Sequence, residues 1–358
     1  MMKQTVLAFS MMLLVLVGCR PSLQPTGTSP PSAPTPSPTD TPILQGPEWA
    51  VYDMANSGLP SIIIQGLAID AQGNIWIGTD GAGLAKFDEE IWTVYDSDNS
   101  GLPNNRIYAL DIDAHGNAWI GTYGGGLAKF DGETWTLYNT DNSGLPGNTI
   151  QYLAVDTQGS IWIGTREAGL AKFDGETWTI YNTDNSGLPY DGVQGLTIDA
   201  QGSLWIGTGT YWTSLGGGLV KFDGETWAVY DTDNSGLPHN KVFPVDFDAQ
   251  GNIWIPTYGG GLAKFDGETW TVYNTDNSGL PSDVVQALAI DGQGNIWSGC
   301  WQGAGLTKFD GETWTTYDTE NSGLPAKGIF RLAIDTQGNV WIGTYGGGLA
   351  VYRLGAVK

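Results

Sequence analysis

The sequence predicts an all-β protein, a seven-bladed β-propeller with four antiparallel strands in each blade. The triplet Gly-Leu-Pro recurs at intervals of about 43 residues, and seven units of that length match propeller blades. Each unit contains four short apolar runs separated by turn signals, and no apolar stripe of helical period follows residue 18. The triplets begin at Gly58, Gly101, Gly144, Gly187, Gly236, Gly279 and Gly323.

The third unit shows the four strands of one blade, which we number from the innermost strand outward. They are expected at residues 150–155, 160–165, 169–173 and 177–181. The stretch Asp-Thr-Gln-Gly at 156–159 supplies the first turn and Asp174-Gly175 supplies the third, since Asp-Gly is a strong hairpin signal.

Fourteen of the 16 tryptophans recur at fixed places in the second and fourth strands. We therefore expect them to pack between blades rather than to form a ligand site. They are Trp76, Trp119, Trp162, Trp205, Trp254, Trp297 and Trp341 in second strands, and Trp49, Trp92, Trp135, Trp178, Trp227, Trp270 and Trp314 in fourth strands.

The order of strands predicts how the ring closes. The first recognisable strand, at 49–52, has the sequence of a fourth strand, whereas the last unit stops after its third strand, at 349–353. We predict that the N-terminal strand joins the last blade and completes it, which leaves no long open edge.

The first 18 residues have the architecture of a signal peptide, with Lys3 ahead of an apolar run. Leu16-Val17-Gly18-Cys19 resembles the bacterial lipobox, which implies lipidation of Cys19; the alternative is an ordinary signal peptide with an incidental cysteine. Residues 19–46, rich in Pro, Ser and Thr, are expected to be an extended tether, and 47–358 the propeller. The expected location is the cell surface or the periplasmic face of a bacterial membrane.

Composition excludes several classes of protein. The chain has 38 acidic and 15 basic residues and a net charge of −23, which argues against nucleic acid as a partner and leaves the lipid as the only expected membrane contact. Two cysteines cannot form a disulfide framework, and two histidines are too few for most histidine metal sites. We expect no metal, no cofactor and a monomer.

The two faces of the predicted ring differ in sequence. We call the face with the second-to-third and fourth-to-first loops the loop face, and the face with the other two connections the turn face. The turn face is monotonous, and its carboxylates, such as Asp113, Asp156, Asp199 and Asp131, are expected to be solvated turn residues. The loop face varies from unit to unit, so its residues are not dictated by the fold.

Aromatic and basic residues gather on the predicted loop face. Trp212 and Trp301 are the two tryptophans outside the repeat framework, and five cations map to this region, namely Arg106, Arg166, Lys241, Lys327 and Arg331. Aromatic rings stack on sugars and Arg pairs with carboxylates, so an oligosaccharide or another small polar or anionic ligand is expected. The alternative is loop variation without function. The candidate ligand-binding residues are Arg106, Tyr123, Arg166, Tyr211, Trp212, Tyr258, Trp301, Arg331 and Tyr345.

Catalytic motifs are sparse. His115 and His239 are expected on opposite faces, which leaves no histidine pair. Asp111 and Asp246 interrupt the small face of the first strand and are either acid/base groups or channel residues bridged by water. Cys300 is expected to be a small core residue.

One segment resembles the start of a calcium-binding loop. The stretch at 231–236 reads Asp-Thr-Asp-Asn-Ser-Gly, as an EF-hand loop would begin. The twelfth position is Val242 where a Glu is required, which disfavours calcium.

The repeated unit NSGLPxxxIxxLAIDxQGNIWIGTxxGGLAKFDGETWTVY resembles the two-component regulator propeller repeat of bacterial hybrid signalling proteins. The resemblance covers residues 49–352 and implies an extracytoplasmic, sensor-like propeller that binds a ligand, often an oligosaccharide, and works with a signalling partner protein. Streptogramin-lyase propellers have similar Gly-Asn-x-Trp turns, but their His-rich metal site has no counterpart in this sequence. An extracellular lyase or hydrolase and a protein-interaction scaffold are the alternatives.

Overall fold

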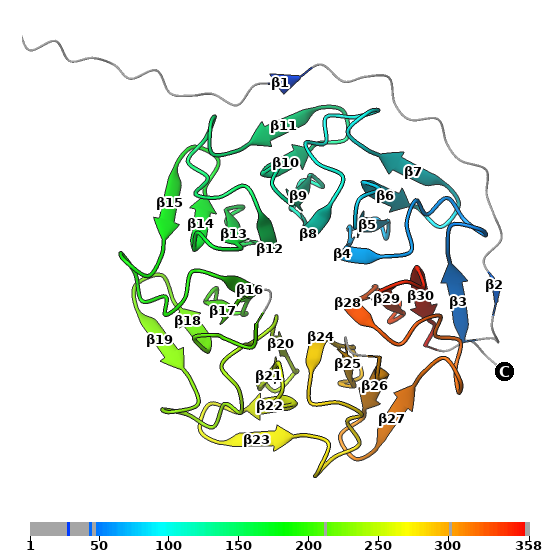
Figure 1. Cartoon of the computed structure of the whole chain (residues 1–358), viewed down its shortest axis with the longest axis vertical. Helices are drawn as coiled ribbons and strands as arrows, with labels where there is room; N and C mark the ends of the chain where they lie inside the picture. Colours follow the sequence, from blue (N-terminus) through cyan, green and yellow to red (C-terminus); the bar gives the residue numbers. More distant parts are fainter. Residues whose placement is uncertain (1–26, 29–42, 45–47, 211–212, 301–302, 355–358) are drawn as a thin grey trace, which may run out of the picture.

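The computed structural model describes residues 27–28, 43–44, 48–210, 213–300 and 303–354. Seven antiparallel sheets stand around a central channel like the blades of a propeller, and the described residues contain no helix (Figure 1). The predicted fold class is confirmed. In the third blade the observed strands agree with the expected ones to within one residue at each end.

The strands of the blades fall into four concentric layers. The first strands are β4 (Ile64–Ile69), β8 (Ile107–Ile112), β12 (Ile150–Val155), β16 (Val193–Ile198), β20 (Asp246–Phe247), β24 (Val285–Ile290) and β28 (Ile329–Ile334). The second strands are β5 (Ile75–Thr79), β9 (Ala118–Thr122), β13 (Ile161–Thr165), β17 (Leu204–Thr208), β21 (Ile253–Pro256), β25 (Ile296–Cys300) and β29 (Val340–Thr344). The third strands are β6 (Leu84–Phe87), β10 (Leu127–Phe130), β14 (Leu170–Phe173), β18 (Leu219–Phe222), β22 (Leu262–Phe265), β26 (Gly305–Phe309) and β30 (Leu349–Tyr352). The outer strands are β7 (Trp92–Tyr95), β11 (Trp135–Tyr138), β15 (Trp178–Tyr181), β19 (Trp227–Tyr230), β23 (Trp270–Tyr273), β27 (Trp314–Tyr317) and β3 (Trp49–Tyr52).

The N-terminal strand closes the ring as predicted. β3 pairs with β30 in antiparallel register, with Trp49 opposite Tyr352 and Tyr52 opposite Leu349. All four residues of β3 are buried, and the Trp49 ring packs edge-on against Tyr352 at 5.1 Å. Blade seven therefore combines the two ends of the propeller (Figure 1).

Two short strands come from the expected tether. β1 (Gly27–Thr28) pairs with the outer strand of blade two, and β2 (Ile43–Leu44) pairs with β3. These two places in the tether therefore lie along the outer edge of the ring. The rest of residues 19–46 and the predicted lipidation residue Cys19 lie outside the described residues.

In each of the first six blades, an Asp, a Trp and a Lys contact one another near the turn face. The indole Nε1 of the second-strand Trp donates a hydrogen bond to the Asp of the first turn, as from Trp162 to Asp156 at 3.2 Å. The third-strand Lys lies opposite this Trp, and its Nζ is 4.8–5.6 Å from the centroid of the indole ring. Blade seven keeps Asp335 and Trp341 but has Val351 in place of the Lys.

These turn aspartates correct one expectation. The side chains of Asp113, Asp156 and Asp199 are only 8%, 8% and 6% exposed, so they are not solvated turn residues. The turn chemistry is present, since each carboxylate also accepts backbone N–H groups of its own turn, but its second oxygen is held by the indole. Asp131, in the third turn of blade two, is exposed as expected.

The glycine of the Gly-Leu-Pro triplet is required by contact between blades. A Cβ on Gly144 would lie 2.5 Å from the Cβ of Trp178, the outer-strand Trp of the next blade. The following Leu145 is buried in the core between the same blades. The Gly and Leu of the recurring triplet are therefore required where one blade packs closely against the next.

Removal of residues 47–53 is expected to lower the midpoint of thermal unfolding far more than removal of 20–46. The first deletion takes away the four buried residues of β3 and opens the ring, whereas the described part of the second consists of two strands of two residues each. Thermal melts followed by circular dichroism test this. Equal losses in the two truncations would contradict the role given to β3.

Asp156→Ala is expected to destabilise the protein by about 2–4 kcal/mol, because it leaves the indole N–H of Trp162 and two turn N–H groups without their acceptor. The matched control is Asp174→Ala in the same blade, where the carboxylate is fully exposed and the loss should be much smaller. Denaturant unfolding of both variants measures the difference, and a larger loss in the control would refute the interpretation.

Candidate ligand-binding face and central channel

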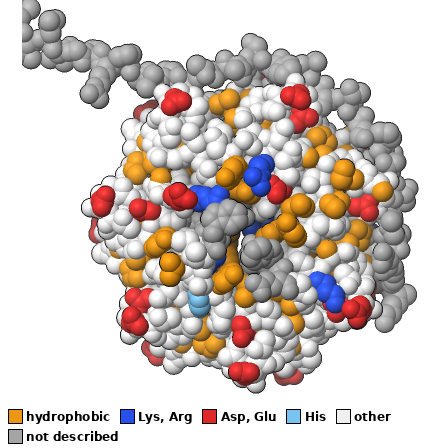
Figure 2. All heavy atoms as spheres, viewed as in Figure 1, with side chains coloured by type: hydrophobic (Ala, Val, Ile, Leu, Met, Phe, Trp, Pro, Cys, Tyr) orange, Lys and Arg blue, Asp and Glu red, His pale blue; other side chains and the backbone are white. Residues whose placement is uncertain are grey.

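The loop face carries positive charge near its centre although the chain is acidic. Figure 2 shows a face of the ring on which Lys and Arg side chains lie close to the centre and Asp and Glu lie mainly toward the rim. Three of the five predicted cations, Arg106, Arg166 and Arg331, come from blades two, three and seven and meet the aromatic residues described next. Lys241 forms a separate cluster in blade five.

Tyr123 is the centre of the first cluster. The Cζ atoms of Arg106 and Arg166 lie 4.9 and 5.5 Å from the centroid of its ring, and Tyr108 packs edge-on against it at 5.7 Å. Arg106 also pairs with Asp80 of blade one, Nε to Oδ1, at 2.5 Å. Part of the positive charge is therefore neutralised, and Tyr123 is held in a fixed orientation beside the buried Arg166.

Arg166 separates two hollows of the loop face. One, of about 390 Å³, is lined by Tyr123, Thr149 and Arg166 among others, and the second, of about 620 Å³, by Arg166, Tyr190 and Thr210 among others. Because Arg166 lines both, a ligand spanning blades two to four would contact this residue.

Lys241 forms the second cluster, in blade five. It is 3% exposed, its Nζ donates to the carbonyl of Thr213 at 2.9 Å, and the same atom lies 4.2 Å from the centroid of the Tyr258 ring. Burial lowers the pKa of Lys241 to about 8 and also lowers the pKa of His239, whose Nδ1 accepts the backbone N–H of Lys241. Tyr258 was predicted for the site. Lys241 is one of the five cations expected on the loop face, and its burial could not be inferred from the sequence.

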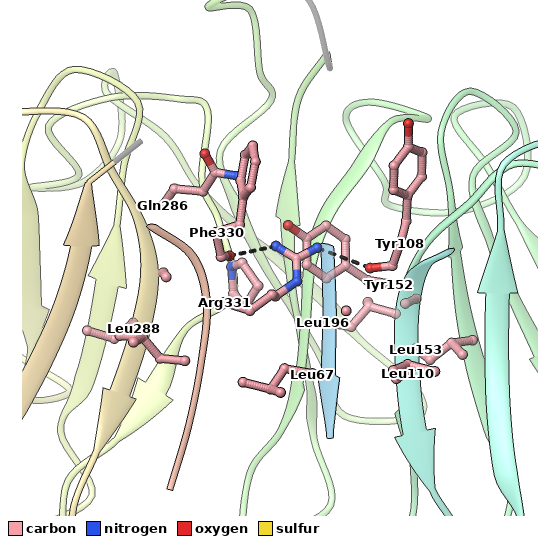
Figure 3. Close-up of a pocket in the computed structure, with 15 residues that line it drawn as sticks. Leu67, Tyr108, Leu110, Tyr152, Leu153, Leu196, Gln286, Leu288, Phe330 and Arg331 are labelled. Atoms are coloured by element: carbon pink, nitrogen blue, oxygen red, sulfur yellow. Dashed lines mark hydrogen bonds between the residues drawn. The ribbon is translucent and has the colours of Figure 1, made fainter. Parts of the chain in front are cut away.

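Arg331 lies inside the central channel (Figure 3). Its Nη1 donates to the carbonyl of Phe330 at 2.9 Å, and its Nη2 donates across the channel to the carbonyl of Tyr108 in blade two at 3.2 Å. The guanidinium Cζ lies 5.1 Å from the centroid of the Tyr152 ring. One side chain from blade seven therefore contacts blades two and three.

A cavity of about 160 Å³ surrounds Arg331. Its floor is apolar because every inner strand except β20 places a leucine at the same level, and Figure 3 shows labelled leucines below the guanidinium. Tyr108 and Gln286 lie above the leucines (Figure 3). The inner strands begin at the loop face, so this cavity is the mouth of the channel on that face. The leucines are Leu67, Leu110, Leu153, Leu196, Leu288 and Leu332.

The remaining predicted residues have different positions. Tyr345 is 52% exposed and packs edge-on against Phe330 at 5.3 Å, near the Arg331 cavity. Lys327 does not join the aromatic clusters, since its Nζ pairs with Glu320 at 3.1 Å and Asp318 at 3.4 Å. The predicted ligand residues Tyr211, Trp212 and Trp301 lie outside the described residues.

Asp111 and Asp246 join neighbouring blades. One oxygen of Asp111 accepts the N–H of Ile112 at 2.8 Å, and the other accepts the N–H of Val155 in the next blade at 2.9 Å. Asp246 repeats this arrangement with Phe247 and Ile290. Burial raises the pKa of each carboxyl to about 6. We expected either an acid/base role or bridging by water. The structure instead bonds each carboxylate directly to the backbone of two blades.

The other reactive groups are the two histidines and Cys300. His115 lies in a first turn and is 85% exposed, whereas His239 lies in a loop beside Tyr258. Cys300 is fully buried, as expected of a core residue, and burial raises the pKa of its thiol to about 12. Across the described ranges, no three His, Cys, Asp or Glu residues are grouped so as to hold a metal ion. Within those ranges, no helix has the length and apolarity needed to span a membrane.

A family model described as two component regulator propeller matches six stretches of the chain, 58–81, 101–124, 144–167, 187–210, 279–302 and 323–346. The corresponding stretch of blade five, which holds Lys241 and Tyr258, is not among them. No curated protein matches the chain significantly in sequence.

Several solved structures share the fold. The extracellular domain of a hybrid two component system from B. thetaiotaomicron matches with a TM-score of 0.72 and 24% identity, over 86% of this chain and 41% of that one. PorZ, a surface component of the type-IX secretion system of Porphyromonas gingivalis, gives 0.69 and 16%, over 84% and 48%. Virginiamycin B lyase from Staphylococcus aureus gives 0.67 and 13%, over 86% and 99%. The chain thus spans well under half the length of the two component domain, and these likenesses establish the fold alone.

Asp111→Asn is expected to change how stability depends on pH. The native pKa is raised to about 6 against about 3.9 in the unfolded chain, so between these values the native state binds the extra proton and stability falls as pH rises. The advantage of wild type over the variant should therefore decrease by about 1 kcal/mol between pH 5 and pH 8.

Asp131→Asn is the control for this measurement. The pKa of Asp131 is lowered to about 2 by its hydrogen bonds with Thr134, so it does not titrate in that range. Denaturant unfolding at both pH values gives the two differences. For each variant, the difference in unfolding free energy from wild type is compared between pH 5 and pH 8. If this difference changes with pH no more for Asp111→Asn than for Asp131→Asn, the pKa of the buried Asp111 carboxyl is not raised.

Proposed function

We propose that this chain, which carries two component regulator propeller repeats in six of its seven blades, is an extracytoplasmic ligand-binding domain of the sensor type. Its ligand is an oligosaccharide or another small polar or anionic molecule, and it binds on the loop face. A lipid on Cys19 holds the protein at the membrane, and a signalling partner protein responds to the bound state.

One observation carries the proposal. In a protein of net charge −23, Arg106, Arg166 and Arg331 converge on the centre of one face and each lies against a tyrosine ring. Sugar rings stack on aromatic side chains, and the polar hydroxyl and carboxyl groups of sugars accept hydrogen bonds from guanidinium groups. The fold needs none of these residues, because other blades have different ones at the same places.

The comparisons support the sensor part of the proposal. The repeats belong to a family named for two component regulators, and the likeness to the extracellular domain of a hybrid two component system agrees with export. The signal-peptide sequence of the first 18 residues and the lipobox at Cys19 point to the same location.

The enzyme alternative has less support. Both oxygens of Asp111 and of Asp246 accept backbone N–H groups, which gives these carboxylates a structural use. His239 lies on the loop face and His115 in a first turn, so the two imidazoles do not form a pair. The lyase of similar fold is 13% identical and therefore says nothing about activity here.

A glycan screen on the exported chain, with Cys19→Ser to keep it free of lipid, tests the proposal. We expect at least one oligosaccharide to raise the melting temperature without being cleaved. Tyr123→Ala and Arg166→Ala should each weaken its binding about tenfold, because each removes a stacking or charged contact worth about 1–2 kcal/mol.

Lys327→Ala is the matched control, since Lys327 is paired with Glu320 and Asp318 away from the aromatic clusters and its loss should leave binding unchanged. If no glycan binds and a surface protein co-purifies with the chain, the protein is an interaction scaffold. Turnover of the bound glycan would instead establish an enzyme.

A further inference from the structure

We propose that the mouth of the central channel is a subsite for the carboxylate of an acidic sugar, with Arg331 as its ion-pair partner. The inference rests on the proposed function, because it assigns one end of the saccharide on the loop face to a defined position. The acidic residue of the ligand enters the channel end-on, and the rest of the saccharide extends over the loop face toward Tyr123 and Arg166.

Arg331 is oriented before any ligand arrives. A guanidinium has five N–H donors, and the hydrogen bonds to the carbonyls of Phe330 and Tyr108 use two of them. These bonds and the Tyr152 ring fix the plane of the guanidinium. The remaining donors form the planar fork that binds a carboxylate through two parallel hydrogen bonds.

The charge of Arg331 has no counterion in the part of the chain that the structure describes. No carboxylate there forms an ion pair with it, whereas Arg106 is paired with Asp80 and Lys327 with Glu320. Asp111, three residues beyond Tyr108 on the same strand, gives both its oxygens to backbone N–H groups. A cation in a channel walled by leucines therefore lacks an anion, which a ligand can supply.

Amide donors lie at the same level of the ring. Gln286 lines the cavity, and the equivalent residues of blades three and four, Gln151 and Gln194, are each 3% exposed. The Nε2 atoms of Gln151 and Gln194 have no hydrogen-bond partner within the described ranges. Gln286 thus supplies an amide donor at the mouth itself, as suits a ligand with carboxylate and hydroxyl oxygens.

The size of the cavity limits what can enter. Its volume of about 160 Å³ is several times the roughly 30 Å³ that one water occupies in the liquid, so it accepts a carboxylate and its neighbouring carbons but not a chain of sugars. The leucine floor lowers the local dielectric constant, which strengthens the ion pair. A single cation also suits a monoanion better than a phosphate dianion.

Calorimetry with paired ligands tests the proposal on the exported Cys19→Ser chain. The probes are oligogalacturonides and oligogalactosides of equal length, which differ in their carboxylates. We expect the acidic oligosaccharide to bind at least tenfold more tightly than the neutral one. Arg331→Gln should abolish that preference, whereas Lys327→Gln, which removes the same charge outside the channel, should preserve it.

Two measurements separate binding from folding. Thermal melts show whether Arg331→Gln is folded, and Arg331→Lys, which keeps the charge but loses the planar fork, should retain part of the preference for the acidic ligand. If Arg331→Gln does not fold, the proposal is tested with Arg331→Lys alone. It is overturned if that variant prefers the acidic oligosaccharide as strongly as wild type does.

The outcomes for the two proposals differ. Equal affinity for acidic and neutral ligands, or equal loss in Arg331→Gln and Lys327→Gln, overturns the carboxylate subsite and leaves saccharide binding intact. Preference for free phosphate over galacturonate also overturns it. Failure of every saccharide, acidic and neutral, overturns the proposed function and the subsite with it.

Discussion

The pairing of β3 with β30 is the constraint on which the rest of the structure depends. It joins the two ends of the propeller in blade seven and brings blade seven against blade one, where Ile63 and Tyr345 form an isolated bridge. Only in a closed ring can Arg331 of blade seven donate a hydrogen bond to Tyr108 of blade two across the channel. The contact of Arg331 with blade two is therefore a consequence of closure, since an open arc of sheets would leave blade seven apart from blade two.

Much of the fold could be predicted because the same strand and turn signals recur in every repeat. The period of about 43 residues, the Asp-Gly turns and the alternation of apolar residues locate strands within a blade. The burial of the turn aspartates could not be predicted from these signals. An Asp at the start of a turn is usually solvated, but here the indole of Trp162, six residues after Asp156, supplies a buried donor that needs an acceptor. The regular spacing of Asp and Trp in every repeat was the available signal.

The site was predictable in composition but not in detail. Arg106, Tyr123 and Arg166 were expected on one face and do meet there, because their loops have fixed places in a propeller. Lys327 belongs to the same class of loop, yet it pairs with acidic residues seven and nine positions earlier in the chain. Arg331 directly follows the register shift of β28, at the place that Tyr152 has in β12, and sequence alone does not show such a shift.

Blade five departs from the regular repeat only at the loop face. Near the turn face it keeps the Asp, Trp and Lys contacts of the other blades. Trp254 donates a hydrogen bond to Asp248, and the Nζ of Lys264 lies over the Trp254 ring. At the loop face its inner strand is reduced to two residues, because Pro244 has no N–H to donate to the ladder. Irregular contacts replace the lost pairing, among them a hydrogen bond from Thr197 of blade four to the carbonyl of Val245. The regular strand is given up only at the end that holds Lys241 and Tyr258. A local break of this kind, confined to one face of a regular repeat, agrees with the proposed binding surface on a scaffold that remains intact elsewhere.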